Sequence, residues 1–424
     1  MQNDNAKFKI IFTFLSVILI FTFYSLHLIT AFAADDPQQL KDAINEKTQI
    51  LQEINRKMLQ AQKDLDATEN KGRTLQNEIK QADYRVNRLN LSIKSSEINI
   101  EKLGLEIKSL GYDIGKIGQQ VSIEKGGISQ FLKEIQKKDG EELILILLKN
   151  KSLSENIDNL RNIADLNAKL SDEIANLSQL NEELSGKLDL SSQKKIGIEQ
   201  ENKNLKNKKI IASGEKQDKQ ELLVQTKNQE KNYQSLINNL EKQQEEIAAE
   251  IEKMDAELRL KIDPNLLPTS RPGVLIYPIP GAVMTQGYGA TTFAKYGYKG
   301  QWHNGLDFAA AVGTPVLAAE KGAVVEVWDQ DKYCYRGAYG KFIAIKHENN
   351  LTTLYAHLSL AAVKKGDSVN RGDVIGYVGK TGYSTGPHLH FTVYASQTFY
   401  IGPSKVNCGP IMPYGGDLDP QKYL

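Results

Sequence analysis

The chain has 424 residues, with 53 Lys and Arg against 52 Asp and Glu, so its formal net charge is +1. The length predicts about three domains, and the balanced charge gives no global field that would attract nucleic acid or an anionic membrane surface. Only two cysteines are present, which excludes a disulfide-rich scaffold and a thiolate zinc ribbon.

The first segment, residues 1–34, is predicted to be a signal peptide or a membrane anchor. Two lysines precede residues 10–34, a run without Asp, Glu, Lys or Arg. The run ends in AFAA, directly before two aspartates, and AFA fits a small-x-small cleavage pattern. The alternative is an uncleaved anchor, because the run approaches the roughly 20 residues that span a bilayer. We therefore expect the rest of the chain to be exported: periplasmic, cell-wall associated, or at the outer face of the cytoplasmic membrane.

The distribution of proline separates a helical segment from the C-terminal part of the chain. One of the twelve prolines is Pro37 and the other eleven lie from Pro264 onward. Proline is the strongest breaker of a helix interior. Residues 38–263, which contain none, are therefore predicted to form long helices.

Heptad spacing predicts a coiled-coil domain over residues 35–262. Steps of seven from Ile44 to Ile135 meet an aliphatic residue or Met at thirteen of fourteen positions, and a second apolar series lies three residues further along. This 3.5-residue period is typical of a left-handed coiled coil. A helix of about 95 residues would be roughly 140 Å long.

An interruption of the heptads predicts that this segment folds back on itself. Residues 143–148 are six consecutive apolar residues, too wide for a two-stranded seam. The seven-residue step then resumes at Ile163 and again at Tyr233. We expect an antiparallel hairpin with a helical elbow near 140–165. The rod alone is typical of a spacer or dimerisation element. The alternative is a regulatory arm, which is motivated by the apolar run, because that run needs burial.

A Pro-rich linker, residues 263–273, leads into a segment of different texture, residues 274–424. Short runs rich in Val, Ile and Tyr, bounded by Gly, Asp and Asn, predict β-strands joined by tight turns. The predicted fold class is therefore α + β in separate domains: long antiparallel coiled-coil helices, followed by a small, mostly antiparallel all-β domain.

Five of the six histidines lie in this last domain. QWHNGLDF contains His303 and Asp307 four residues apart, LYAHLS contains His357, and GPHLHFTVY contains His388 and His390. The fifth, in IKHENN, lies beside a turn and is expected to be solvated. The alternative interpretation treats these residues as unrelated polar groups on strand edges.

If HLHFTVY is a strand, His388, His390 and Thr392 lie on one face and the intervening apolar residues on the other. Catalytic zinc needs three protein ligands and an open fourth position. His303, Asp307 and either His388 or His390 supply such a set. The remaining two histidines, including His357, can take a proton from water and stabilise a developing oxyanion.

The two cysteines, Cys334 and Cys408, leave two possibilities open. An exported protein meets an oxidising milieu, so a disulfide is plausible. Two separate thiols are about equally compatible with the sequence.

These motifs resemble the LytM/lysostaphin family of zinc metallopeptidases, which cut peptide bonds in bacterial peptidoglycan. The resemblance runs from about Pro278 to Leu424 and includes HNGLDFAAAVGTPVLAAEKGAVV, TTLYAHLS, VKKGDSVNRGDVIGYVGKTGYSTGPHLHF and DPQKYL. It implies an antiparallel β domain with one zinc ion in a groove that accepts an extended peptide. By this likeness the zinc ligands are His303, Asp307 and His390, and the residues that act on water and the intermediate are His357 and His388.

The sequence departs from the family pattern in three places. Thr392 follows HLHF, where relatives often have Glu, and DQDKYCYRGAYG and SQTFYIGPSKVNCGPIMPYGG resemble loop insertions that each carry one cysteine. If a disulfide links these two loops, they would reshape the groove and change which peptide bond is cut.

The order of segments also resembles that of cell-division murein hydrolases and their activators. EnvC-type relatives have lost zinc ligands and activate separate amidases, and PcsB-type proteins carry a similar coiled coil that docks to the FtsEX membrane complex. The sequence thus predicts an exported zinc metalloendopeptidase that acts on peptidoglycan, with a regulatory coiled coil that covers the groove until an FtsEX-type partner withdraws it. The alternatives are a non-catalytic EnvC-like activator and a scaffold in which zinc only stabilises the fold; no nucleic-acid partner is expected.

Overall fold

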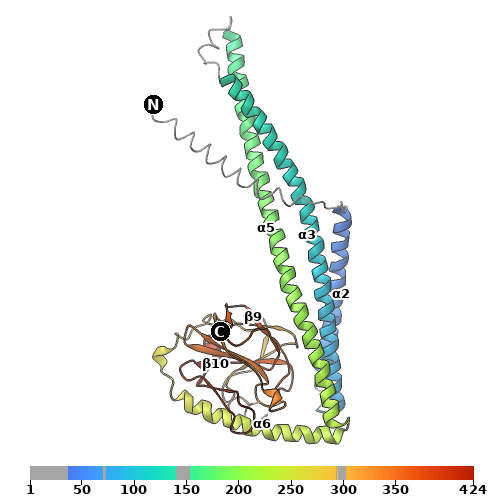
Figure 1. Ribbon diagram of the computed structural model, residues 1–424, viewed down its shortest axis with the longest axis vertical. Coiled ribbons are helices and arrows are strands. Elements are labelled where there is room, and N and C mark those ends of the chain that lie inside the picture. Colours follow the sequence, from blue (N-terminus) through green and yellow to red (C-terminus); the bar gives the residue numbers. More distant parts are fainter. Residues whose placement is uncertain (1–36, 70–72, 140–152, 293, 295–301) are drawn as a thin grey trace. The chain divides into compact units, whose positions relative to one another are not determined.

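The computed structural model describes residues 37–69, 73–139, 153–292, 294 and 302–424 (Figure 1). The predicted export segment, residues 1–34, and the apolar run 143–148 lie outside the described residues. The chain divides into two compact units. One holds the chain up to Gln52 and Glu97–Asn202, and the other holds Glu53–Ser96 and Lys203–Leu424.

Long helices fill the first half of the described chain, as the absence of proline predicts. They are α2 (Pro37–Glu69), α3 (Leu75–Asp139), α5 (Leu153–Thr226) and α6 (Glu230–Arg259). None of these described helices is apolar enough over a sufficient length to cross a membrane. The two parts of the predicted fold class, long helices followed by an antiparallel β domain, are thus confirmed in chain order.

Helices α3 and α5 run antiparallel within each unit. In the second unit, Arg85 pairs with Glu215 and Lys208 donates to Ser96. In the first unit, Lys194 pairs with Glu106 and Lys187 pairs with Asp113. In both units the partner's number falls along α5 as the number rises along α3, which is the pattern of an antiparallel pair (Figure 1).

A sharp corner joins α5 to α6. Lys227 and Asn228 both have left-handed backbone conformations, with φ of 48° and 53°, a region that non-glycine residues enter rarely. Tyr233, one turn into α6, packs with Leu75 and Leu222 in a small apolar cluster beside the corner. The chain therefore leaves the direction of α5 here and enters α6 along a new axis (Figure 1).

The C-terminal domain is built on antiparallel strands, whose pairings are all antiparallel among the described residues. The main sheet has the order β1-β2-β10-β6-β5-β4-β8, with β13 paired to β10; a second sheet has the order β3-β9-β7, and β11 pairs with β12. The strands are β1 (Val283–Gln286), β2 (Leu306–Ala309), β3 (Pro315–Leu317), β4 (Gly322–Asp329), β5 (Lys341–His347), β6 (Leu351–Ala356), β7 (Leu358–Ala361), β8 (Ser368–Val369), β9 (Val374–Val378), β10 (His388–Ala395), β11 (Tyr400–Gly402), β12 (Met412–Tyr414) and β13 (Asp417–Leu418).

The alternation predicted for HLHFTVY is confirmed in β10. Leu389, Phe391 and Val393 are fully buried in the main core of the domain. Because side chains alternate along a strand, the two β10 histidines lie on the opposite face. The core thus fixes the face to which His388 and His390 belong.

A second apolar cluster joins α6 to the two inserted loops of the β domain. Ile247 and Leu258 of α6 pack with residues from these loops, among them Cys334, Cys408 and Tyr414. Cys334 and Cys408 form a disulfide, which settles the choice that the sequence left open. The disulfide links the two loops, and Ile247 is completely buried against them.

The expectation that the histidine of IKHENN is solvated is wrong. His347 is the last residue of β5 and is only 3% exposed. Its ring nitrogens contact the Lys321 carbonyl at 3.0 Å and the Thr353 hydroxyl at 2.7 Å. The turn begins after His347, so the side chain still belongs to the sheet interior.

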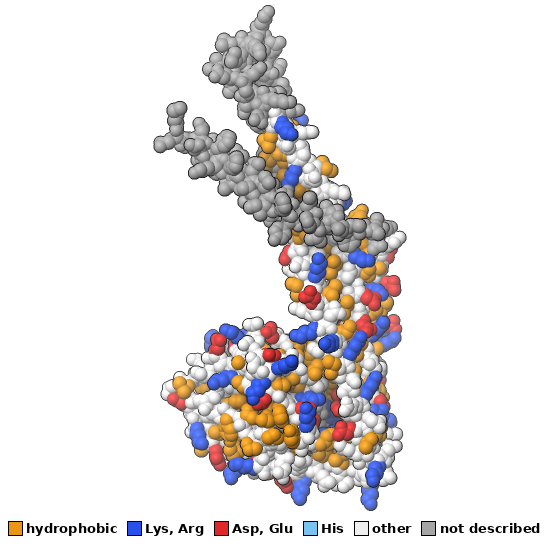
Figure 2. Space-filling model, viewed as in Figure 1, with side chains coloured by type: hydrophobic (Ala, Val, Ile, Leu, Met, Phe, Trp, Pro, Cys, Tyr) orange, Lys and Arg blue, Asp and Glu red, His pale blue; other side chains and the backbone are white. Residues whose placement is uncertain are grey.

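Charges of both signs are interspersed over the described residues on the face drawn in Figure 2, in agreement with the near-zero net charge. A single-sign surface of the kind that binds nucleic acid is not visible on this face of the described residues. A cluster of three potential metal-ligating residues, His303, Asp307 and His390, lies in the β domain.

Candidate metal centre

All five side chains singled out from the sequence line one cleft in the β domain, with a volume of about 400 Å³. They are His303, Asp307, His357, His388 and His390. The interpretation as unrelated polar groups on separate strand edges required them to lie apart. The structure instead brings all five together.

Two adjacent strands form the floor of the cleft. Asp307 of β2 lies directly opposite His390 of β10, and His390 is also opposite Ala356 of β6. His303 precedes β2 and is held by two main-chain hydrogen bonds with Gly289. Gly305 lets the strands meet, because a Cβ there would lie 2.5 Å from the Phe391 carbonyl oxygen and 2.9 Å from the His390 ring.

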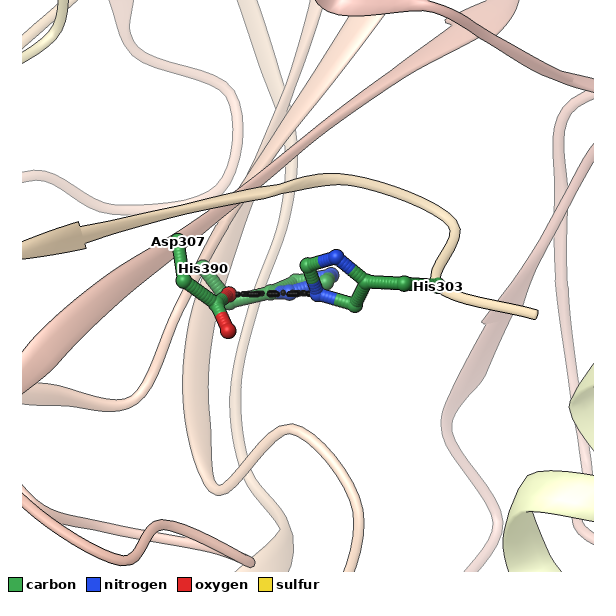
Figure 3. Close-up of side chains that lie close together, drawn as sticks. All are labelled: His303, Asp307 and His390. Carbon is green, nitrogen blue, oxygen red and sulfur yellow. Dashed lines mark hydrogen bonds and ion pairs between the residues drawn. The ribbon is translucent and has the colours of Figure 1, made fainter. Parts of the chain in front are cut away.

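Three donor atoms converge on this floor (Figure 3). The Asp307 Oδ1 atom lies 3.2 Å from His303 Nε2 and 2.9 Å from His390 Nδ1, and the two ring nitrogens are 3.0 Å apart. The potential ligand atoms of the three residues all lie within 4.8 Å of one another. Two imidazole nitrogens and one carboxylate oxygen in such proximity fit the ligand set of a divalent metal.

The hydrogen bonds of His303 orient it for this role. Its Nδ1 lies 2.7 Å from the Gly287 carbonyl oxygen, which can only accept, so Nδ1 carries a proton. A ligand histidine normally donates its other ring N–H in this way. The Nε2 atom is therefore the one that faces the Asp307 carboxylate.

His357 and His388 lie side by side next to the three donors. Their ring centroids are 4.7 Å apart, and His388 Nε2 lies 3.8 Å from Asp307 Oδ1. Each ring contacts a backbone carbonyl through Nδ1, that of Thr381 at 2.8 Å and that of Gly386 at 2.9 Å. In both rings, Nδ1 therefore carries a proton when the ring is neutral. Nε2 points away from the carbonyl and is the nitrogen that can accept a proton.

The backbone of His357 is held in an unusual conformation. His357 lies between β6 and β7 with φ of 59°, and such left-handed positions cost energy for non-glycine residues. Its main-chain N–H donates to the Tyr339 carbonyl, which helps to hold it. Non-glycine residues in this region cluster at functional sites.

The pKa values of Asp307, His303 and His357 in the cleft are shifted in different directions. Burial favours the neutral form of Asp307, but the charge and hydrogen bond of His303 outweigh it and hold the pKa of that carboxyl well below its usual range. Burial likewise acts against charge on His303, yet Asp307 raises the pKa of this imidazole. Burial, reinforced by His388, keeps the pKa of His357 well below its ordinary value. His357 is thus neutral at pH 7 and able to accept a proton.

Helix α6 forms one wall of the same cleft, which heptad spacing did not predict. Gln244, Ala248, Ile251 and Glu252 line it, and we call these four residues the α6 wall. Further along α6, the buried Asp255 accepts hydrogen bonds from Asn304 Nδ2 and the Gly415 N–H, each at 3.0 Å. No local pattern connects these residues, because Asp255 and Asn304 are far apart in the sequence.

Comparison with known proteins identifies the domain. Residues 301–403 match Peptidase family M23. The chain is 46% identical over 89 residues to the DD-carboxypeptidase/endopeptidase Mpg of Neisseria meningitidis serogroup B, and 47% identical over 89 residues to the peptidoglycan DD-endopeptidase ShyA of Vibrio cholerae. Each of these matches covers 21% of this chain and 19% of the relative, so the chain spans about a fifth of the length of these relatives.

Among solved structures, the catalytic domain of lysostaphin from Staphylococcus simulans is 34% identical, with a TM-score of 0.25, over 33% of this chain and 90% of that one. The match to Peptidase family M23 spans HNGLDF, LYAHLS and GPHLHF, the motifs that line the cleft. The resemblance to the LytM/lysostaphin family is thereby confirmed for this part of the chain. The match to Peptidase family M23 falls within the C-terminal β domain.

Proposed function

We propose that this protein is an exported zinc metalloendopeptidase that hydrolyses peptide bonds in peptidoglycan. One observation carries the proposal. The potential ligand atoms of His303, Asp307 and His390 lie within 4.8 Å of one another, and His357 and His388 lie in the same cleft. An activator or scaffold would have no chemical need for all five groups. The relatives named peptidoglycan DD-endopeptidases support the substrate class.

Zinc is the proposed metal because two imidazoles and one carboxylate are a common catalytic zinc set. When bound, the metal would polarise the scissile carbonyl and make water more acidic. His303, Asp307 and His390 would hold it. The chain has no free thiol to recruit a softer metal, since both of its cysteines are paired.

The remaining two histidines are proposed to act on the substrate. His357 is neutral and has Nε2 available, so it is suited to accept a proton from water and return it to the leaving amine. His388, beside it, is suited to stabilise the oxygen that gains negative charge at the scissile carbonyl, by donating a hydrogen bond from Nε2 when both of its ring nitrogens carry a proton. Their backbone anchors, the carbonyls of Thr381 and Gly386, help to keep both rings in place, and the Ser384 hydroxyl also lies 3.2 Å from His388 Nδ1.

The test uses purified peptidoglycan sacculi and the chain without residues 1–34. We expect soluble muropeptides whose masses, measured by mass spectrometry, identify one class of cleaved peptide bond. A chelator should stop their release, and Zn²⁺ should restore it. His303→Ala should lose both metal and hydrolysis; wall-degrading activity at the wild-type rate in this variant would refute the proposal.

Helix α6 is proposed to regulate the enzyme. Its wall shares the cleft with all five chemical groups, so a peptidoglycan strand and the α6 wall compete for space there. The sequence alone suggested a regulatory arm through the apolar run 143–148; the contacts of α6 now supply independent support. A membrane complex of FtsEX type is the proposed partner that withdraws α6, acting through the coiled coil.

Export is proposed on the basis of residues 1–34, and the disulfide between Cys334 and Cys408 is in keeping with an oxidising compartment. N-terminal sequencing of the protein from cell fractions would decide between cleavage before Ala34 and an intact anchor. A full-length chain found only in the cytoplasmic fraction would refute export. Binding of the FtsEX-type partner is testable with purified extracellular domains and the full chain.

A further inference from the structure

We propose that Thr392 is a positioning residue for metal binding: its hydroxyl accepts the hydrogen bond from Nε2–H of His390, the proton that this ring must keep while Nδ1 acts as a ligand. This inference rests on the proposed function, because it assigns a role toward the metal. The relevant contact joins Thr392 Oγ1 to His390 Nε2 at 2.9 Å, between two buried residues of β10.

The other three histidines of the cleft are oriented by the backbone. His303, His357 and His388 each contact a main-chain carbonyl through Nδ1, those of Gly287, Thr381 and Gly386 at 2.7–2.9 Å. A carbonyl oxygen can only accept a hydrogen bond, so Nδ1 carries the proton in each of these three rings. Only the main chain of Gly287, Thr381 and Gly386 takes part in this. The Ser384 hydroxyl also lies 3.2 Å from His388 Nδ1. His390 differs, because its Nε2 contacts a hydroxyl, which can accept or donate.

The orientation of His390 makes this contact decisive. Its Nδ1 is the atom turned toward the other two donors, 2.9 Å from Asp307 Oδ1 and 3.0 Å from His303 Nε2. A neutral imidazole has one N–H and one lone pair. If Nε2–H donates to Thr392, the lone pair of Nδ1 points at the metal position; if the proton moves to Nδ1, that lone pair is lost.

The carboxylate of Asp307 makes the wrong tautomer attractive. With Thr392 absent as an acceptor, a proton on Nδ1 would gain a hydrogen bond to Asp307 Oδ1 at 2.9 Å. A proton left on Nε2 would instead be a buried donor without a partner, which is unfavourable. Both effects act against metal binding, and the hydroxyl of Thr392 removes the second by accepting the Nε2–H.

Local packing leaves little room for a substitute acceptor. Thr392 has no exposed surface, and His390 is only 5% exposed. Gly305 lies against these two residues: a Cβ on Gly305 would lie 2.9 Å from both Thr392 Oγ1 and His390 Cε1. A side chain or an added water has no space between these groups, so the hydroxyl cannot readily be replaced.

The hydroxyl of Thr392 is a neutral hydrogen-bond acceptor. Threonine satisfies the minimal requirement, which is an acceptor for one N–H. Hydrogen-bond partners of ligand histidines typically contribute 10–100-fold to metal affinity.

The test measures Zn²⁺ affinity of the full chain without residues 1–34, by competition with a chromophoric chelator. Thr392→Val preserves shape and removes the hydroxyl, and we expect it to weaken Zn²⁺ binding by about 10–100-fold. Thr392→Ser keeps the hydroxyl and should retain affinity within about threefold. The matched control is Thr352→Val, which removes another fully buried hydroxyl of the same sheet, bonded to Ser396 rather than to the cleft.

A second readout is the tautomer itself. In ¹⁵N spectra of the metal-free protein labelled at histidine, Thr392→Val should move the His390 proton from Nε2 to Nδ1, while the thermal midpoint stays near that of Thr352→Val. Unchanged Zn²⁺ affinity in Thr392→Val, or an equal loss in Thr392→Ser, would overturn the inference. A wild-type chain that binds no Zn²⁺ at all would overturn the proposed function instead.

Discussion

The floor of the cleft and the α6 wall belong to the same compact unit, yet different kinds of contacts hold them. The floor consists of β2 and β10, whose main-chain ladder places Asp307 opposite His390. The α6 wall is attached by side chains, through the packing of Ile247 and the hydrogen bonds of Asp255. Main-chain ladders resist single substitutions, whereas a side-chain attachment can be weakened one residue at a time.

Because of this difference, we expect substitutions in the floor to affect the hydrolytic reaction itself and substitutions under the α6 wall to affect its regulation. Substitutions in the floor should abolish hydrolysis, because no other residue can replace a ligand or a proton acceptor. Substitutions under the α6 wall should instead increase hydrolysis, because they free the cleft without altering its chemical groups. The two regions therefore predict effects of opposite sign on the same measurement.

The largest expected effect comes from His357, which lies in the same cleft as the floor. His357→Ala removes the proposed proton acceptor, and such groups contribute roughly 10²–10⁴-fold to turnover. The released muropeptides should fall by that factor, while the Zn²⁺ content, measured by atomic absorption, should remain at one per chain. Loss of zinc together with activity would show that His357 holds the metal and would contradict its assigned role.

A smaller effect of opposite sign is expected under the α6 wall. Ile247→Ala removes a completely buried side chain, at a cost of about 2–5 kcal/mol. The lower figure corresponds to a shift of about 30-fold in the docking equilibrium of α6. Sacculus hydrolysis should rise, and hydrogen exchange should increase along α6 while β10 stays protected.

The control for this substitution is Leu260→Ala, at the end of the same helix. Leu260 is 89% exposed, so its truncation should change neither exchange nor hydrolysis. Hydrolysis by Ile247→Ala at the wild-type rate, with α6 demonstrably released, would show that the α6 wall does not limit access.

The disulfide tests whether the inserted loops carry the α6 wall. Replacing both Cys334 and Cys408 by Ser should destabilise the domain by about 2–5 kcal/mol. Because Ile247 packs against these loops, hydrolysis measured below the thermal midpoint should rise as well. The control is to measure the thermal midpoint of both proteins with and without reductant. The variant should have the same midpoint in both conditions, and the wild type should have a lower midpoint when it is reduced, because only the wild type has a disulfide to lose.

The smallest effect concerns pH. Burial, followed by the nearby Asp417, raises the pKa of Asp255 well above its usual range, and Arg259 and Asn304 only partly oppose this. The docked helix therefore holds a proton that the released helix gives up, so docking is favoured at low pH and weakens as the pH rises. Relative hydrolysis should increase with pH, by at most about tenfold per unit. Asp255→Asn should flatten this dependence.

The sequence predicted the floor well because its determinants are local. HxxxD at the entry to β2 and HxH along β10 place side chains by strand periodicity alone, and the apolar residues between the β10 histidines determine which face is inward. The long helices were predictable for a similar reason, since a run without proline and with a seven-residue repeat leaves few other options. The choice of Thr392 as partner of His390 was visible only as a departure from the family.

The α6 wall could not be predicted because it depends on contacts between distant residues. The heptad positions Tyr233 and Ile247 are buried, as the repeat indicates, but Ile247 packs against the β domain rather than against another helix. The burial of His347 was missed for a related reason: its partners, Lys321 and Thr353, come from neighbouring segments of the sheet. Periodicity predicts that a side chain is buried, not which surface buries it.

The covalent continuity of α6 has a consequence for how such an enzyme can be switched on. The helix is joined to α5 by the corner at Lys227 and Asn228 and to the β domain by the short segment 263–273, so it cannot diffuse away. For a flexible tether of this length the local concentration of the helix is of roughly millimolar order. Dilution of the protein would then leave the helix in place, and a freely diffusing competitor would need comparable abundance. Mechanical displacement, transmitted along α5, is the more economical trigger.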